Sequence, residues 1–289
     1  MEYENRTVPE GINVSKDHPL KEFFILALGL GTAVVVLVVA LSFAAGWLVQ
    51  FVPFETELML AEKFSFTGGK RSEELSEQAN TKANEESKVQ QEKIETYLQN
   101  LANQLSAAQQ LPDGMTISVH YIDDDMVNAF ATLGGNIIIF KGLIEKLPNE
   151  NALAMVMAHE IAHIKHRDPM VAAGRGLTIG LALASLAGFG DSVVAQQLLN
   201  KVGLITSMSF SRQQEEKADA EALNALLNYY GHVKGAEVLF EILKKEEQGV
   251  TSPLFLSTHP LNDKRISAIK NYREQQASDG ELTDLPKLF

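Results

Sequence analysis

The stretch Asn151–Lys165, NALAMVMAHEIAHIK, is the part of the sequence around which the rest can be arranged. It predicts a strong helix, and within it His159-Glu160-Ile161-Ala162-His163 forms an H-E-x-x-H motif. Residues four apart lie on one helical face, so His159 and His163 can present imidazole nitrogens to one ion. Glu160 lies beside them, where it can accept a proton from a water molecule bound to that ion. The spacing therefore predicts a catalytic metal site, although two histidines can also align by chance.

A third protein ligand is needed, because a catalytic zinc takes three and leaves one position for water. The chain has no cysteine, so this ligand must be His, Asp or Glu. The best source is the segment SRQQEEKAD at 211–219, which opens a later helix. Glu215 can reach the metal, and Asp219 can hold the second nitrogen of a ligand histidine. Glu216 and His166 remain alternative ligands.

Periodicity and turn residues predict a mostly helical α+β domain with one small sheet just before the central helix. Glycines at 134 and 135 form the turn between the second and third strands. The strands are expected at Met115–Ile122, Asn128–Leu133 and Asn136–Phe140. Helices are expected at 89–108, 142–147, 151–165, 171–189, 193–207, 212–229, 233–246 and 263–275.

An uncharged segment, Phe23–Phe54, precedes this domain. About 20 apolar residues in a helix cross the hydrocarbon core of a bilayer, so the segment predicts a transmembrane anchor. A cleaved signal peptide is the alternative, but its apolar region is shorter, about 7–15 residues. Arg6, Lys16 and Lys21 precede the span and Lys63 alone follows closely, which places the N-terminus in the cytoplasm. In a bacterial cell the protein would lie in the inner membrane, with the catalytic domain in the periplasm.

The composition excludes several classes of protein. Of 289 residues, 37 are acidic and 25 are basic, a net charge of −12, and no basic stripe suggests a nucleic-acid partner. The absence of cysteine excludes a disulfide scaffold, iron–sulfur clusters and thiol catalysis. The expected division is a tail at 1–22, the anchor at 23–52, a polar linker at 53–88, a zinc metallopeptidase domain at 89–280 and a tail at 281–289.

A second apolar segment, Leu177–Gly190, lies between the two helices that carry the expected ligands. At 14 residues it is too short to span a bilayer. Burial in the core is the favoured interpretation. A mobile lid over His159 and His163, or a segment lying in the membrane interface, is the alternative.

Four motifs, in order, resemble zinc metallopeptidases of the HtpX and CAAX-prenyl-endopeptidase type, metallopeptidase family 48. The likeness covers about half the chain, and the single anchor makes it closest to the Oma-like or BepA-like quality-control members. The motifs are NAFATLGGNIIIFKGLIEKL at 128–147, NALAMVMAHEIAHIKHRD at 151–168, SRQQEEKADAEAL at 211–223 and STHPLNDKRISAI at 257–269.

The resemblance implies a gluzincin fold with one zinc ion per chain. It implies that His159, His163 and Glu215 are the ligands, which favours Glu215 over Glu216, and that Glu160 is the general base. Asp219 would support a ligand, and His259 and Arg265 would lie near the site, where either could stabilise an oxyanion. Ala131, Thr132 and Leu133 would belong to an edge strand that aligns the substrate.

The function expected from these features is a membrane-anchored zinc endopeptidase that hydrolyses peptide bonds with metal-activated water. Its partners would be the lipid bilayer and protein or peptide substrates, such as misfolded or membrane proteins in membrane or envelope quality control. The alternative from another class is a membrane-tethered chaperone or scaffold whose proteolysis is weak or gated. A hydrolase of a non-peptide substrate is a third possibility.

Overall fold

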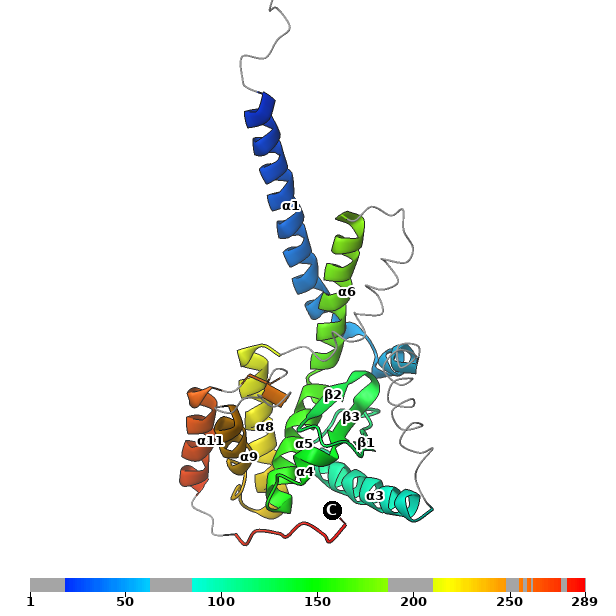
Figure 1. Ribbon diagram of the computed structural model, residues 1–289, viewed down its shortest axis with the longest axis vertical. Helices are drawn as coiled ribbons and strands as arrows, with labels where there is room; N and C mark the ends of the chain where they lie inside the picture. Colours follow the sequence, from blue (N-terminus) through cyan, green and yellow to red (C-terminus); the bar gives the residue numbers. More distant parts are fainter. Residues whose placement is uncertain are drawn as a thin grey trace, which may run out of the picture.

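The computed structural model describes residues 19–62, 85–186, 210–247, 255–256, 259–260, 262–276 and 280–288. A long helix, α1 (Pro19–Leu48), rises away from a helical domain that contains one small sheet (Figure 1). With the short 3-10 helix η1 (Val49–Phe51) it forms an apolar helical segment of 33 residues, Pro19–Phe51. An 18-residue window of this segment has a mean hydropathy of 2.8, and none of that window is buried. By length and composition, this is the one helix among the described residues that could cross a membrane.

The sheet has three strands in the order β1-β3-β2. β2 (Ala129–Thr132) and β3 (Asn136–Phe140) form the expected antiparallel hairpin. Its turn is the 3-10 segment η2 (Leu133–Gly135), where Gly134 and Gly135 have φ of 76° and 75°, values that glycine adopts without strain. β1 (Ser118–Ile122) pairs in parallel with β3, which leaves β2 at the edge.

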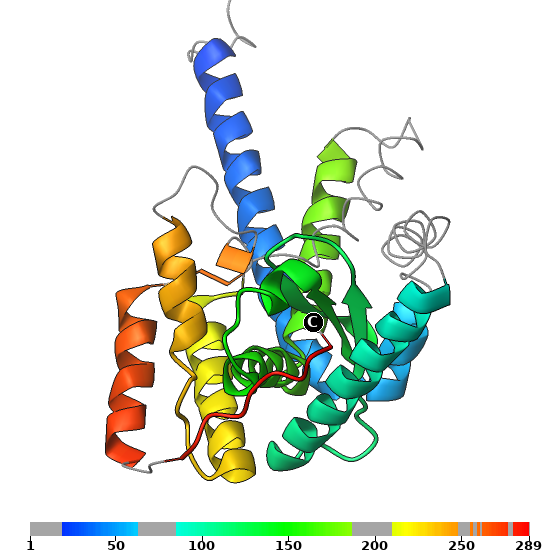
Figure 2. The ribbon, with the colours of Figure 1, turned by 60° about the horizontal axis from the view of Figure 1, so that its bottom comes forward.

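The helix α5 (Glu150–Lys165) lies at the centre of the domain. The side chain of Asn149 caps its N-terminus by accepting from the backbone N–H of Ala152 at 2.9 Å. Every residue from Asn151 to Ile164 is buried, so the helix has no solvent-facing stripe. It packs between the sheet and the helices α3 (Glu85–Ala108) and α8 (Arg212–Tyr230), which places the H-E-x-x-H motif inside the core (Figure 2).

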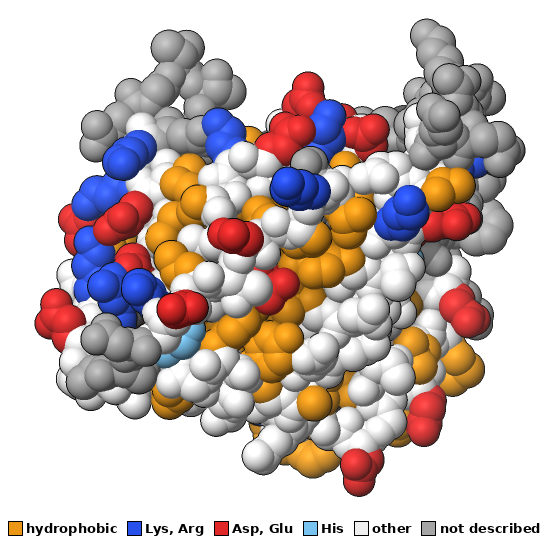
Figure 3. Space-filling model, turned by 90° about the horizontal axis from the view of Figure 1, so that it is seen from below, with side chains coloured by type: hydrophobic (Ala, Val, Ile, Leu, Met, Phe, Trp, Pro, Cys, Tyr) orange, Lys and Arg blue, Asp and Glu red, His pale blue; other side chains and the backbone are white. Residues whose placement is uncertain are grey.

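Three further described helices are α4 (Lys141–Ile144), α9 (Val238–Glu247) and α11 (Asp263–Gln276). The short α4 follows β3, and α9 and α11 lie beside α8 (Figure 1). The expected helix at 193–207 falls outside the described residues. Seen from the end away from α1, acidic and basic side chains are interspersed with apolar ones (Figure 3).

The segment 280–288, expected as a tail, is held against the domain and runs across one end of α5 (Figure 2). The carbonyl of Thr283 accepts from the backbone N–H of Glu150 at 2.8 Å. The N–H of Thr283 in turn donates to Asn151 Oδ1 at 2.8 Å. These two bonds tie the end of the described chain to the first turn of the central helix.

The apolar segment after α5 differs from the favoured expectation of a core position. α6 (Asp168–Leu186) includes its first ten residues and rises beside α1, away from the sheet (Figure 1). Small residues allow the two helices to approach, since a Cβ added to Gly46 would meet Val171 Cγ1 at 3.4 Å. Leu177 is 40% exposed. Residues 187–190 fall outside the described residues.

The first part of the region expected as a polar linker, 53–88, is also packed in an unexpected way. A helix at 54–62 follows η1, lies to one side of the base of α1 (Figure 1) and packs against the turn η2. Its residue Glu57 is only 2% exposed, so this part of the region belongs to the folded structure.

Candidate active site

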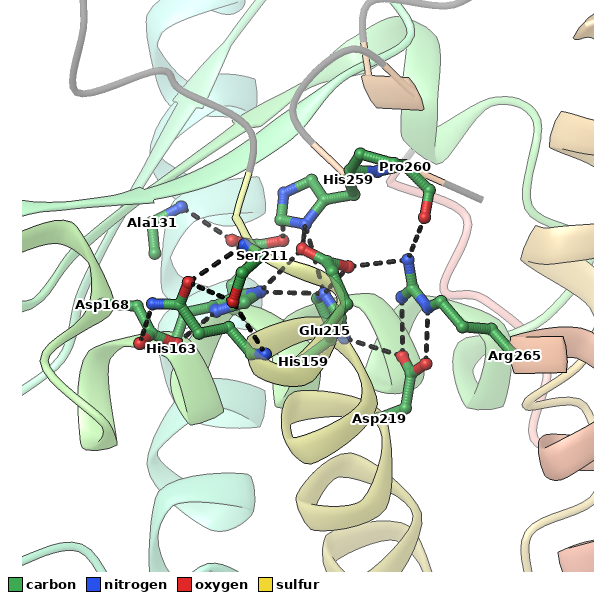
Figure 4. A network of polar contacts seen from close by, with 12 residues as sticks. Ala131, His159, His163, Asp168, Ser211, Glu215, Asp219, His259, Pro260 and Arg265 are labelled. Atoms are coloured by element: carbon green, nitrogen blue, oxygen red, sulfur yellow. Dashed lines mark hydrogen bonds and ion pairs between the residues drawn. The ribbon is translucent and has the colours of Figure 1, made fainter. Parts of the chain in front are cut away.

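The Nε2 atoms of the two motif histidines face each other in the site. His159 and His163 lie one turn apart on α5, and their Nε2 atoms are 3.1 Å apart. Both side chains belong to the network of polar contacts in Figure 4. Their exposed fractions are 2% and 0%. The helical spacing and the buried position of α5 therefore produce the pair that the sequence predicted to face one ion.

Glu215 comes from the first turn of α8 and closes the cluster from the opposite side. The helix begins at a capping box in which Ser211 and Gln214 satisfy each other's backbone N–H groups. Glu215 Oε2 lies 3.4 Å from His159 Nε2, and Glu215 Oε1 lies 3.5 Å from His163 Nε2. The neighbouring Glu216 is exposed and pairs with Lys264 at 2.6 Å, outside the cluster.

His166, the spare ligand considered from the sequence, also lies outside the cluster of ligand atoms. It follows the last residue of α5, and its Nε2 is 3.6 Å from Glu221 Oε1.

Each motif histidine has a carboxylate on its other nitrogen. Asp219 Oδ1 lies 3.0 Å from His159 Nδ1, as expected for its supporting role. Arg265, 2% exposed, holds Asp219 with Nε and Nη2, and its Nη1 lies 2.6 Å from Glu215 Oε2. All three guanidinium nitrogens thus face carboxylates of the cluster.

The corresponding partner of His163 is Asp168, which the sequence reasoning missed. Its Oδ2 lies 2.8 Å from His163 Nδ1, and its Oδ1 accepts from Gln214 Nε2 at 2.5 Å. Asp168 is five residues beyond His163, a spacing that does not share a helical face. The chain turns back at Arg167, whose φ of 62° ends α5 and starts α6. An acidic residue just past the motif was the available signal.

His259 lies deeper in the site than expected. Its Nδ1 is 3.2 Å from His159 Nε2 and 3.1 Å from Glu215 Oε1. Its Nε2 is 3.3 Å from Glu160 Oε1. Burial lowers the pKa of His259, which favours the neutral ring. The ring therefore bridges the expected ligands and the expected general base.

Glu160 lies between the cluster and the edge strand. Its Oε2 accepts from the backbone N–H of Ala131 at 2.7 Å, which ties the carboxylate to β2. Burial raises the pKa of Glu160, as a low-dielectric environment does for any carboxyl group. Of the other expected strand residues, Thr132 ends β2 and Leu133 begins the turn η2.

The donor set fits a metal ion. One atom each from His159, His163, Glu215 and His259 can be chosen so that all lie within 4.8 Å of one another. Nitrogen ligands about 2.0–2.1 Å from a tetrahedral zinc are roughly 3.3–3.4 Å apart, close to the spacing of the two Nε2 atoms. Burial acts to lower the pKa of His159, yet Asp219 and Glu215 raise it to about 10. The same carboxylates that favour a protonated ring favour a bound cation.

Comparison with known proteins agrees with this geometry. Residues 89–273 match peptidase family M48. The chain is 33% identical over 171 residues to the mitochondrial metalloendopeptidase OMA1 of Schizosaccharomyces pombe, covering 57% of this chain and 49% of that protein. It is 29% identical over 167 residues to the beta-barrel assembly-enhancing protease of Escherichia coli, covering 53% and 34%.

A third relative is the metalloprotease LoiP of Escherichia coli, which is 30% identical over 158 residues, covering 53% of this chain and 60% of LoiP. The chain therefore spans roughly a third to three fifths of these relatives' lengths. The family match covers more than half of the chain and includes every residue of the buried cluster. The chain belongs to peptidase family M48.

Proposed function

We propose that this protein is a membrane-anchored, zinc-dependent endopeptidase that acts in membrane or envelope protein quality control. The observation that carries the proposal is the buried convergence of His159, His163 and Glu215 beside Glu160. Three protein ligands and an adjacent carboxylate are the components of hydrolytic zinc sites. With no cysteine in the chain, imidazole and carboxylate ligands supply the site.

In the proposed mechanism, His159, His163 and Glu215 would hold one zinc ion, and the bound ion would supply Lewis-acid chemistry toward a carbonyl and a water molecule. Glu160 takes the proton, because its Oε1 has no hydrogen-bond partner of normal geometry among the described residues. Its Oε2 stays fixed to the N–H of Ala131, which holds the carboxylate in position. Asp219 and Asp168 orient the two ligand rings through Nδ1.

His259 and Arg265 have different places in this proposal. His259 Nε2 faces Glu160, on the side where a substrate carbonyl would lie, so it is the candidate for stabilising the oxyanion. The guanidinium of Arg265 faces Glu215 and Asp219, so the proposed role of Arg265 is to position those carboxylates.

The substrate would bind along β2. The strand pairs with β3 on one side only and is the edge of the described sheet. An extended peptide can add to such an edge through backbone hydrogen bonds. Ala131 binds Glu160 through its backbone N–H, and Ala131, Thr132 and Leu133 are the proposed aligning segment.

The proposed location follows from α1. A single apolar helix with basic residues before it supports a bacterial inner-membrane anchor with a cytoplasmic N-terminus and a periplasmic catalytic domain. The names of the relatives, a mitochondrial endopeptidase and a beta-barrel assembly-enhancing protease, support misfolded or membrane proteins as the substrate class.

A gated protease with a chaperone or scaffold role is the second candidate. The burial of the site favours it, since His163 and Glu215 are each 0% exposed and His259 is 1% exposed. In this candidate, a group that covers the site would have to move before a substrate could reach these atoms. This candidate predicts weak casein cleavage by the wild type and faster cleavage after a change that exposes the site to solvent. A protease without a gate would cleave casein at the same rate in both cases.

The test uses the full chain in detergent, with casein as substrate and Glu160→Gln as the central variant. Glutamine keeps the shape but cannot accept the proton, so the rate should fall about 10²–10⁴-fold with zinc content unchanged. Glu216→Gln, an exposed glutamate on α8, is the matched control and should cleave normally. A chelator should abolish the activity, and near-normal turnover by Glu160→Gln would refute the mechanism. Quantitative proteomics of membranes containing wild type or Glu160→Gln would then identify substrates.

A further inference from the structure

A buried carboxylate outside the family match contacts the turn η2, which follows the active-site strand β2. Glu57 lies on the helix at 54–62, which directly follows the proposed anchor, and it is 2% exposed. A buried carboxylate is costly unless it is paired and hydrogen-bonded. Both of its oxygens are engaged, and the two partners come from two different segments of the chain, the turn η2 and the junction between α5 and α6.

The first partner is the turn that ends β2. The backbone N–H of Gly134 donates to Glu57 Oε1 at 2.9 Å. The turn has no room for side chains, because a Cβ on Gly134 would lie 2.6 Å from Ala61 Cβ, and one on Gly135 would lie 3.2 Å from the Phe54 ring. Helix 54–62 therefore fits closely against the end of the strand whose Ala131 N–H binds Glu160.

The second partner is Arg167, at the junction between the metal-binding helix and α6. Its Nε donates to Glu57 Oε2 at 2.6 Å, and its Nη1 donates to the carbonyl of Val52 at 3.0 Å. Its guanidinium also lies over the ring of Phe54, 5.7 Å from the centroid. The next residue, Asp168, binds His163.

The conformation of Arg167 adds an independent observation. Its φ of 62° lies in the left-handed region, which costs a non-glycine residue energy. A glycine would occupy this position without strain. The backbone conformation therefore does not favour arginine at this position. The contacts of its side chain with Glu57, Val52 and Phe54 do.

From these contacts we infer that Glu57 is a positioning residue for proteolysis, which couples the base of the membrane anchor to the substrate-aligning strand. The ion pair with Arg167 holds helix 54–62 against the end of α5. The hydrogen bond to Gly134 holds the end of β2 in the position in which Ala131 binds Glu160. This inference rests on the proposed function, in which a peptide aligns on β2. It extends the catalytic unit to residue 57, although the family match begins at residue 89.

The test compares Glu57→Gln with Glu55→Gln in the full chain reconstituted in detergent. Glu55 is an exposed glutamate on the same helix, so the two variants change the charge equally. Arg167→Gly is the partner variant, because it removes the guanidinium while glycine accepts the backbone conformation. Zinc content, melting temperature, kcat and KM for a peptide substrate, and hydrogen exchange at 129–135 are measured for each.

We expect Glu57→Gln and Arg167→Gly each to lower kcat/KM about tenfold, mainly through a higher KM, with zinc content unchanged. The double variant should be little worse than either single one, since the two residues act as one unit. Exchange at 129–135 should become faster in both variants and stay unchanged in Glu55→Gln.

A structural role alone has a different signature. It would reduce the active fraction, which lowers kcat and the melting temperature and leaves KM unchanged, and this result would overturn the inference. Exchange at 129–135 equal to that of Glu55→Gln would also overturn it. If exchange responds as expected but wild-type cleavage does not depend on Glu160, the coupling stands and the proposed function fails.

Discussion

Arg265 grips Asp219 with two parallel hydrogen bonds inside the core: Nε donates to Oδ2 at 2.7 Å, and Nη2 donates to Oδ1 at 2.8 Å. The same Oδ1 lies 3.0 Å from Nδ1 of His159. Arg265 thus fixes the orientation of the imidazole of His159 through the carboxylate of Asp219. Arginine suits this place, because its planar guanidinium matches both carboxylate oxygens.

Replacing Arg265 with alanine should destabilise the fold strongly. The change leaves Asp219 buried without its cation, which typically costs about 3–5 kcal/mol. Lys264→Ala is the control, since Lys264 pairs with Glu216 at the surface and should cost only about 0–1 kcal/mol. Denaturant titration of both variants measures the difference. Equal midpoints would show that the buried pair is not a stability determinant.

Substitutions of Glu215 and Glu216, two neighbouring glutamates on α8, should affect zinc binding differently. Glu215→Ala removes one of three proposed protein ligands and should abolish stoichiometric zinc binding, whereas Glu216→Ala should retain about one zinc per chain. Elemental analysis of the purified variants provides the measurement. Full zinc in Glu215→Ala would move the third ligand to another residue, with His259 first among the candidates because of its position.

Removal of the His259 ring should affect the rate more than the metal. If the ring stabilises the oxyanion, His259→Ala should lower kcat about 10²–10³-fold while zinc content stays constant. His166→Ala, outside the cluster, should leave both quantities near their wild-type values. Loss of zinc from His259→Ala would instead make His259 a ligand, which its Nδ1 distance of 3.2 Å from His159 Nε2 would explain.

The orientation of the anchor can be tested with a reporter fused after Phe289. Residues 280–288 are bonded to Glu150 and Asn151, so a fusion at this end reports the side on which the catalytic domain lies. A reporter that is active only in the cytoplasm should be silent, because Arg6, Lys16 and Lys21 precede the uncharged segment that starts at Phe23. An active reporter would place the catalytic domain in the cytoplasm.

Local patterns in the sequence predicted the helices α5 and α8, the β2–β3 hairpin and the shared face of His159 and His163. The α5 and α8 helices begin and end within one residue of their expected bounds, and the β2–β3 hairpin forms around the predicted glycines. The pairing of His159 with His163 follows from helical spacing alone. These features depend on residues that are close in the chain, where periodicity and turn chemistry are strong signals.

Contacts between distant segments were harder to predict. The parallel pairing of β1 with β3 and the burial of Glu57 in a region with a polar composition depend on tertiary packing. The position of His259 depends on a contact across 100 residues of sequence. Asp168 was missed for another reason, because its approach to His163 needs the left-handed turn at Arg167, which periodicity does not reveal.

The complete burial of α5 has a consequence for the kinetics of metal exchange. His159 and His163 belong to a helix that the core holds from Asn151 to Ile164, so folding itself has already gathered and oriented the first two donors. Sites that assemble only as the ion arrives must refold each time, as zinc fingers do. Here the ion should leave and return without global unfolding. After removal of the chelator, added zinc should restore activity at a rate limited by ion entry and not by chain folding.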